Sequence, residues 1–180
     1  KLGYKTYEAT GDIYSLFYEC GNKLFRRGGV VCYITSNKWI NASYGKSTRR
    51  YFTEQTNPLI LIDFAKVRIF DTATVFVNIL LFAKGKNEGR LRACTIVGSK
   101  LPDGELRDYF QQRSFQLPSL GEAVWKVNDE AAQMLDSRIE EKGTKLEHWK
   151  GITFYRGITP GFNDAFHIPK EDRGRLIRIN

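Results

Sequence analysis

The feature that most constrains the fold is the run of residues 11–45, GDIYSLFYECGNKLFRRGGVVCYITSNKWINASYG. Its first half predicts an amphipathic helix that ends at a pair of glycines. Its second half predicts a buried strand followed by a polar and aromatic loop. Open α/β sheets bind ligands at the carboxyl ends of their strands, which is where this loop lies. The run therefore predicts both a fold class and the position of a site.

The helix prediction depends on apolar residues that recur at three- and four-residue steps: Ile13, Leu16, Phe17, Cys20 and Leu24. This spacing places them on one stripe, which we expect to face the core. Arg26 and Arg27 suit the carboxyl end of a helix, and Gly28 can adopt the left-handed conformation that ends one. Residues 30–34 are a short apolar run, typical of a strand that is covered on both faces.

Downstream, residues 44–55 predict a second helix, with Arg49 and Arg50 on its outer side. Residues 59–63 and 75–82 predict two strands, and the segment between them is too short for a crossover helix. These strands should therefore be antiparallel neighbours. Further elements are expected as a strand at 90–97 and helices at 101–113 and 128–142. The fold class is α/β, the carboxyl-terminal half of a Rossmann-like sheet that ends in an antiparallel strand pair and continues into a helical connector.

Three regions follow from this order. Residues 1–85 form the half-sheet, residues 86–149 a strand and helical connector, and residues 150–180 the start of another domain, because they are rich in Gly and aromatic residues without a sustained period. The first predicted element is a helix that needs a preceding strand. We therefore expect the chain to be a piece of a larger protein.

The charge distribution favours an anionic partner. The net charge is +8, and residues 1–85 hold 12 basic against 6 acidic side chains. Residues 86–149 hold 10 against 11, and residues 150–180 hold 6 against 3. Both ends are basic, and a basic surface attracts nucleic acid through counterion release.

The cysteines and histidines argue against a metal or a disulfide framework. Cys20, Cys32 and Cys94 are odd in number and form no C-x-x-C pair, which favours reduced thiols in a cytoplasmic protein. His148 and His167 are far apart in the sequence and have no obvious partners there, which favours surface or capping roles for both. We expect no bound metal. No apolar stretch reaches the roughly 20 residues of a membrane span, so the protein should be soluble.

Candidate site residues lie in two loops and on the first helix. In the loop after the first strand, Asn37 could pair with a base, Lys38 could meet a phosphate and Trp39 could stack on a base; alternatively, Asn37 turns the chain and Trp39 covers the sheet edge. Phe70 could stack on an extracted base, or it could be a core residue. Phe17 poses the same choice, since it belongs to the apolar stripe. No G-x-S-x-G elbow, P-loop or Gly-rich dinucleotide turn is present.

Residues 11–52 and 61–82 together resemble the adenine-specific DNA methyltransferases of restriction-modification systems. The similarity covers about residues 4–85 and is carried by the helix, the Gly-Gly pair, the strand, T-S-N-K-W and the strand entry F-D-T-A-T-V, in the family's order. The gamma-class enzymes, including type IIG proteins fused to a nuclease, look most similar. Residues 151–177, with G-F-N-D-A-F-H-I, are similar to the segment that opens the family's target recognition domain.

The resemblance implies transfer of a methyl group from S-adenosylmethionine to the exocyclic amine of an adenine flipped out of double-stranded DNA. It implies that Phe17 lies against the cofactor's adenine and that Phe70 stacks on the target base. Lys38, Trp39, Lys66 and Arg68 are the expected DNA contacts.

The chain departs from the family in what it lacks. The family's Gly-rich cofactor segment and its N-P-P-Y motif do not occur, and Asn57-Pro58 is followed by Leu59 and Ile60. No catalytic residue is therefore assigned, and we expect the chain alone to be inactive without the missing upstream methyltransferase half.

Three hypotheses remain open at this point. The chain is part of a methyltransferase, or a non-enzymatic DNA-binding or assembly module that shares the half-fold, or part of a Rossmann-like enzyme that acts on a small molecule. An N-P-P-Y motif encoded shortly upstream would favour the first.

Overall fold

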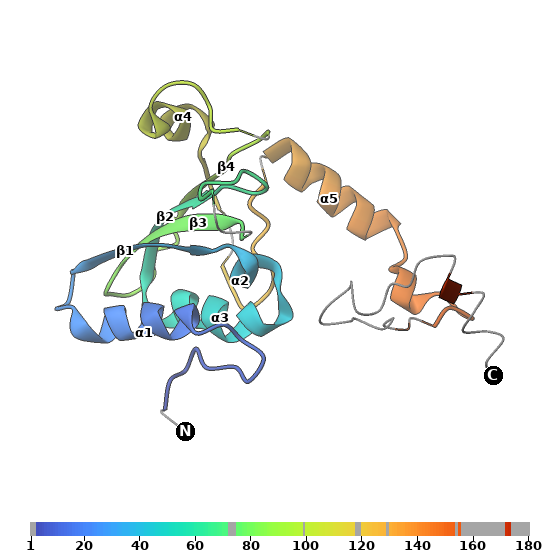
Figure 1. The fold of residues 1–180 in the computed structure, drawn as a ribbon, viewed down its shortest axis with the longest axis horizontal. Coiled ribbons are helices and arrows are strands. Elements are labelled where there is room, and N and C mark those ends of the chain that lie inside the picture. Colours follow the sequence, from blue (N-terminus) through green and yellow to red (C-terminus); the bar gives the residue numbers. More distant parts are fainter. Residues whose placement is uncertain are drawn as a thin grey trace. The chain divides into compact units, whose positions relative to one another are not determined.

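The protein is described by a computed structural model that covers residues 3–71, 75–98, 100–117, 120–128, 130–153, 155 and 172–173. It forms two compact units, Lys1–Arg138 and Ile139–Asn180. The first unit contains the sheet and all the candidate site residues (Figure 1). In the second unit the structure describes the end of α5 and a short 3-10 helix at Leu146–His148.

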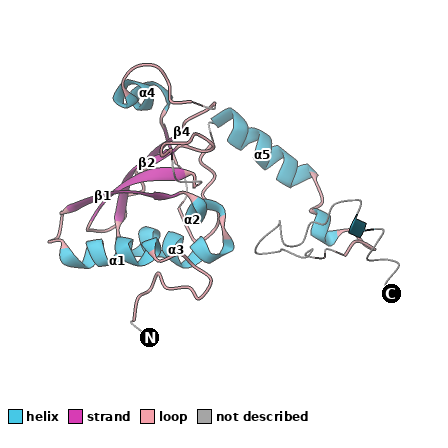
Figure 2. Ribbon diagram, in the orientation of Figure 1, coloured by secondary structure: helices cyan, strands magenta, loops and turns pink. Residues whose placement is uncertain are grey.

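The first unit combines helices and strands (Figure 2). In chain order the elements are α1 (Tyr14–Leu24), β1 (Val30–Ser36), α2 (Lys38–Asn41), a 3-10 turn (Ser43–Gly45), α3 (Lys46–Gln55), β2 (Asn57–Asp63), β3 (Val77–Ala83), β4 (Arg92–Thr95), α4 (Leu106–Arg113), β5 (Phe115–Gln116) and α5 (Glu130–Lys142). The helix predicted at 44–55 and the strands predicted at 59–63 and 75–82 are confirmed within two residues of most ends.

The five strands form one sheet in the order β1-β3-β2-β4-β5. Strand β3 lies between β1 and β2 and is antiparallel to both, whereas β4 is parallel to β2. The predicted α/β fold class and the antiparallel pairing of β2 with β3 are confirmed. Since β1, β2 and β4 run in the same direction, their carboxyl ends, at Ser36, Asp63 and Thr95, meet at one edge of the sheet.

One face of the sheet is covered by α1 and α3, whose aromatic side chains build the main core (Figure 1). The ring of Tyr18 from α1 lies 4.9 Å from that of Phe52 in α3, centroid to centroid, at a T-shaped angle. Trp39 packs against Trp125 at 5.2 Å in the same geometry. Such edge-to-face pairs stabilise a core beyond the area that they bury.

The segment expected as a connector contributes to this same unit. Strand β4 extends the sheet beside β2, and Leu91, Ala93 and Trp125 are buried in the main core. On the opposite face of the sheet, Phe110 of α4 packs with Ile62 and Val67 in a second cluster. Residues of the connector thus cover both faces of the sheet.

The predicted inward stripe of α1 is wrong for three of its residues. Ile13 is 66% exposed, Phe17 56% and Leu24 80%. The helix instead buries Ser15, Tyr18, Glu19 and Asn22. Two of these polar side chains can face the core because they have partners. Glu19 accepts hydrogen bonds from Thr6, and the Asn22 amide donates to the Tyr51 hydroxyl at 2.8 Å.

Strand β1 is not covered on both faces, contrary to the prediction for residues 30–34. Val30 and Ile34 are each 46% exposed, whereas Val31, which points to the opposite face, is buried. Strand β1 is also an edge strand, and within the described residues it pairs with β3 alone.

Most of the expected recognition-domain segment, residues 150–180, lies outside the described residues. Within the described part, no helix combines the length and apolar character needed to cross a bilayer.

Candidate functional site

The carboxyl end of β1 borders a hollow of about 330 Å³. Residues of α1 and β1 line it: Tyr14, Phe17, Tyr33, Ile34, Thr35 and Ser36. Phe17, predicted either as a core residue or as a wall for the cofactor's adenine, is exposed here rather than buried. Its ring is therefore available to a ligand in the hollow.

Tyr14, which lines the hollow, is paired with a second tyrosine. The hydroxyls of Tyr14 and Tyr44 lie 3.2 Å apart. Burial and the neighbouring Tyr44 raise the pKa of Tyr14 well above its ordinary value. Tyr14 is thus a neutral hydrogen-bonding group at physiological pH, able to donate or accept but not to act as an anion.

The loop after β1 does not present Trp39 to solvent. The Trp39 side chain is fully buried, and its indole Nε1 donates to Oδ1 of Asn78 at 3.2 Å. The prediction that Trp39 stacks on a DNA base is therefore wrong. Its ring packs against Tyr18, Phe52 and Trp125 and is not accessible to DNA. Lys38, at the start of α2, is exposed.

Asn37 is committed to contacts within the protein. Its Nδ2 donates to Oδ1 of Asp63 at 2.8 Å and to the carbonyl of Ala65 at 3.4 Å. These bonds favour the alternative in which Asn37 holds the chain, rather than the one in which it pairs with a base.

The loop between β2 and β3 carries the second group of predicted residues. Lys66 and Arg68 are exposed, and Phe70 is 44% exposed. The core interpretation of Phe70 is therefore wrong, and its ring is accessible. The loop starts where β2 ends, at the same sheet edge as the loop after β1.

Asp63 is a site residue that the sequence analysis did not single out. It is only 9% exposed, and burial raises its pKa against the opposing effect of hydrogen bonds from Asn37 and from the Ala65 N–H. Its position in the sequence could have identified it, because Asp63 is the polar residue that ends a buried strand, at the edge where α/β sheets bind ligands.

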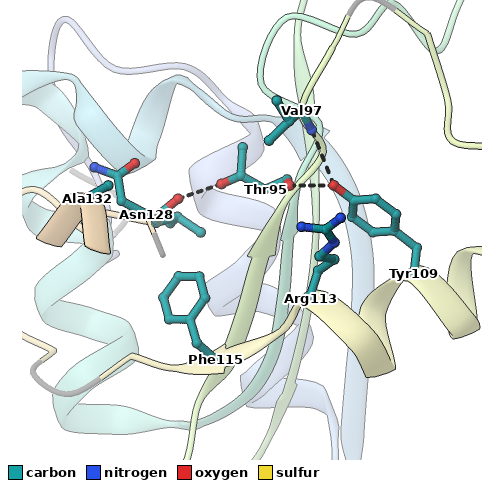
Figure 3. A pocket seen from close by; sticks show the side chains of 8 residues that line it. Thr95, Val97, Tyr109, Arg113, Phe115, Asn128 and Ala132 are labelled. Atoms are coloured by element: carbon teal, nitrogen blue, oxygen red, sulfur yellow. Dashed lines mark hydrogen bonds between the residues drawn. The ribbon is translucent and has the colours of Figure 1, made fainter. Parts of the chain in front are cut away.

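A second hollow, of about 220 Å³, lies at the carboxyl end of β4 (Figure 3). Its hydroxyl groups are used internally, because Thr95 Oγ1 donates to the carbonyl of Val127 and the Tyr109 hydroxyl donates to the carbonyl of Thr95 at 3.1 Å. These bonds fasten α4 and the chain around Val127 to β4. We assign this hollow a structural role. Among the described residues, no group of three or more His, Cys, Asp or Glu side chains could hold a metal.

The sequence matches a known family over its first part. Residues 1–70 match the family described as Eco57I restriction-modification methylase. The type II restriction enzyme and methyltransferase RM.Eco57I of Escherichia coli is 25% identical over 147 residues, which is 79% of this chain and 14% of that protein. The chain thus spans a small part of its relative's length.

Two solved structures match the chain over most of its length. The ATP-dependent Type ISP restriction-modification enzyme LlaBIII bound to DNA has a TM-score of 0.51 at 14% sequence identity, over 72% of this chain and 10% of that one. The type IIG restriction endonuclease BpuSI has a TM-score of 0.49 at 14% identity, over 75% of this chain and 16% of that one. The family match and the E. coli relative confirm the predicted resemblance of this chain to the methyltransferases of restriction-modification systems.

Proposed function

We propose that this chain is part of a DNA methyltransferase of a type II restriction-modification enzyme, which transfers a methyl group from S-adenosylmethionine to the exocyclic amine of a flipped adenine. The match of residues 1–70 to a restriction-modification methylase family supports a methyltransferase role. The reaction requires extrusion of the base, because enzymes that act on a base cannot reach it inside the duplex.

The observation that carries this proposal is the exposure of two aromatic rings beside the carboxyl edge of the sheet. Phe17 borders the hollow at β1, and Phe70 lies on the loop after β2. Exposed phenylalanines cost free energy in water unless a partner covers them. In the proposed complex, Phe17 covers the cofactor's adenine and Phe70 covers the flipped base.

The lining of the first hollow fits an adenine-containing cofactor. Phe17 offers an aromatic face, Ile34 an apolar surface, and Tyr14 and Ser36 hydroxyl groups for hydrogen bonds. S-adenosylmethionine would supply an electrophilic methyl group when bound there. The protein's own groups at this position would bind and orient the adenine end of the cofactor.

Lys66 and Arg68 suit the DNA backbone. Both are exposed on the loop that carries Phe70, and Lys38 is exposed on the neighbouring loop. Cationic side chains around a stacking aromatic ring would neutralise phosphates on either side of the flipped nucleotide.

The apolar surface of α1 and β1 supports the proposal that an upstream half of the same domain packs here. Ile13, just before α1, Leu24 of α1, and Val30 and Ile34 of β1 are all exposed, and β1 offers a sheet edge. An unpaired sheet edge and exposed apolar side chains are features of interaction sites. In this proposal the chain alone is inactive. The whole protein acts in the cytoplasm, where restriction-modification enzymes meet DNA.

The test is methylation by a longer protein that includes the upstream half. Incubated with DNA and S-adenosylmethionine labelled in the methyl group, it should label adenine, whereas the 180-residue chain should not. Nucleoside analysis of the digested DNA identifies the product. Label found on cytosine would contradict the adenine assignment, and no label on any base would contradict the methyltransferase assignment.

A further inference from the structure

One residue, Asn37, joins the ends of three strands through its side chain and its backbone. Asn37 follows β1, and its Nδ2 reaches across to Asp63 at the end of β2. Its backbone N–H donates to the carbonyl of Phe76, immediately before β3, at 3.0 Å. Strands β1 and β2 are not neighbours in the sheet, since β3 lies between them, so Asn37 spans the end of β3.

Asp63 extends this tie into the loop that follows β2. The carboxylate Oδ1 that accepts from Asn37 also accepts the backbone N–H of Ala65 at 3.0 Å. The Asp63 carbonyl accepts the N–H of Ile96, which fixes the main chain of Asp63 against the end of β4. Hydrogen bonds therefore fix both the carboxylate and the main chain of Asp63.

Ala65 needs such support because of its backbone conformation. Its φ of 47° lies in the left-handed region, and it is the one residue other than glycine with positive φ in the described part of the chain. L-residues other than Gly, Asn and Asp adopt this conformation at an energetic cost. Two hydrogen bonds hold Ala65 in this conformation. Its N–H donates to the Asp63 carboxylate, and its carbonyl accepts from the Asn37 amide.

The turn at Ala65 sets the orientation of the rest of the loop. Val67 is 1% exposed and packs in the second cluster, where Ile69 joins it. Lys66, Arg68 and Phe70 alternate with these two residues and are exposed. The turn is closed by the Val67 N–H, which donates to the Phe64 carbonyl at 2.8 Å. The alternation of exposed and covered residues after it leaves Lys66, Arg68 and Phe70 accessible to a partner.

We infer that Asn37 and Asp63 are positioning residues that hold the Lys66–Arg68–Phe70 side of this loop toward DNA, an inference that rests on the proposed function. Neither residue contacts the substrate in this arrangement. Asn37 and Asp63 act through Ala65, by holding the turn from which the loop continues to Phe70. Without the hydrogen bonds of Asn37 and Asp63, Phe70 would be less well positioned to stack on the flipped base, and poor positioning of the base slows methyl transfer.

The test compares Asn37→Ala, Asp63→Ala and Asp63→Asn in the longer protein with Asn22→Ala as a matched control. Asn22 also donates its Nδ2 to two acceptors, at 2.8 and 3.3 Å, but it joins α1 to α3 at the opposite edge of the sheet. Asn37→Ala and Asp63→Ala should lower the single-turnover rate of methyl transfer at least about tenfold, a loss of about 1.4 kcal/mol in transition-state stabilisation, without changing cofactor affinity. Asp63→Asn retains an acceptor oxygen for Ala65 and Asn37 and should recover most of the rate.

A second measurement uses the 180-residue chain itself. Amide hydrogen exchange at residues 65–70 should accelerate at least about tenfold in Asn37→Ala relative to Asn22→Ala. Asn37 is only partly buried, so this variant decides the outcome even if Asp63→Ala does not fold.

The outcomes separate this inference from the proposed function. If Phe70→Ala slows methyl transfer but Asn37→Ala behaves like Asn22→Ala in rate and exchange, the positioning role is overturned and the proposed function stands. If Phe70→Ala leaves methyl transfer unchanged, the proposed role of Phe70 fails whatever the exchange data show. Failure of Asp63→Asn to recover the rate would mean that the charge of Asp63, rather than its hydrogen bonds, matters, and would overturn the role given to the turn.

Discussion

The indole Nε1 of Trp39 donates a hydrogen bond of 3.2 Å to Oδ1 of Asn78. Both side chains are fully buried, and Thr35 Oγ1 donates to the same oxygen at 3.2 Å. One amide in β3 thus anchors the end of β1 and the helix that follows it. The loop after β1, which the sequence predicts as a ligand-binding loop, is therefore fixed to β3 by these hydrogen bonds.

Asn78→Leu should destabilise the protein by about 1 to 3 kcal/mol, because it removes the acceptor of the buried Trp39 indole N–H. Urea denaturation monitored by tryptophan fluorescence checks this. Asn41→Leu, an exposed asparagine on α2, is the control and should change the free energy of unfolding by no more than about 0.5 kcal/mol. Equal effects of the two variants would contradict the anchoring role.

Arg49 and Arg50 are adjacent in α3 but should differ sharply in importance. Arg49, predicted to lie on the outer side, is 3% exposed and donates to the carbonyls of Trp39, Ala42 and Glu122. Burial lowers the pKa of its guanidinium. Arg50 is exposed and pairs with the carboxylate of Glu122.

Arg49→Met should therefore cost at least about 2 kcal/mol in unfolding free energy, since buried carbonyls lose their donors. Arg50→Met should cost distinctly less, because exposed ion pairs contribute little. Chemical denaturation of the two variants side by side decides between them. A larger loss in Arg50→Met would show that the ion pair, rather than the carbonyl contacts, holds this region.

Glu19 should make stability depend on pH below neutrality. It is buried, and although burial opposes ionisation, Lys23 at 2.7 Å and hydrogen bonds from Thr6 lower its pKa below the ordinary 4.5. A carboxyl whose pKa is lower in the folded state contributes stability above the unfolded pKa and loses it as the pH falls through the folded pKa.

Glu19→Gln removes this titration. The wild-type protein should exceed the variant in unfolding free energy at pH 7, and the difference should shrink as the pH falls below about 4. Urea midpoints measured from pH 7 to pH 3 check it. A difference that stays constant over this range would exclude ionised Glu19 as the source.

Cofactor binding should require more than this chain. By calorimetry, the 180-residue chain should show no measurable affinity for S-adenosylmethionine, while the longer protein should bind it. In the longer protein, Phe17→Ala should weaken binding by about 1 to 3 kcal/mol, the contribution of one aromatic stack on a base. Phe25→Ala removes another exposed ring, just beyond α1, and should leave affinity unchanged. Tight binding by the chain alone would mean that the cofactor occupies a different pocket.

Phe70→Ala in the longer protein should weaken capture of the flipped base by about 1 to 3 kcal/mol. The methylated adenine is identified first and replaced by 2-aminopurine, whose fluorescence rises when it leaves the stack. Phe70→Trp retains a stacking face and should preserve the signal. Because Phe70 is 44% exposed, the thermal stability of Phe70→Ala should change little, and an unaltered fluorescence signal would remove Phe70 from the site.

Local patterns in the sequence determined the elements and their order. The strand pattern at 59–63 and the helix pattern at 44–55 correspond to β2 and α3. The short segment between the second and third strands required an antiparallel pair, and β2 and β3 form it. Spacing and turn length are properties of neighbouring residues, so they can be read without knowing what packs against them. The same holds for the resemblance, whose motifs are contiguous.

Only the tertiary structure decided which side of each element faces inward. Three residues of the predicted stripe are exposed, while Tyr18, Glu19 and Asn22 are buried because they find partners elsewhere in the chain. Trp39 is buried because Asn78 and Trp125 contact it from distant segments. The tie between Asn37 and Asp63 joins residues 26 positions apart, on strands separated by a third. Burial and hydrogen bonding are properties of pairs brought together by folding. For that reason the sequence by itself predicts where a site lies, and the fold decides which side chains serve it.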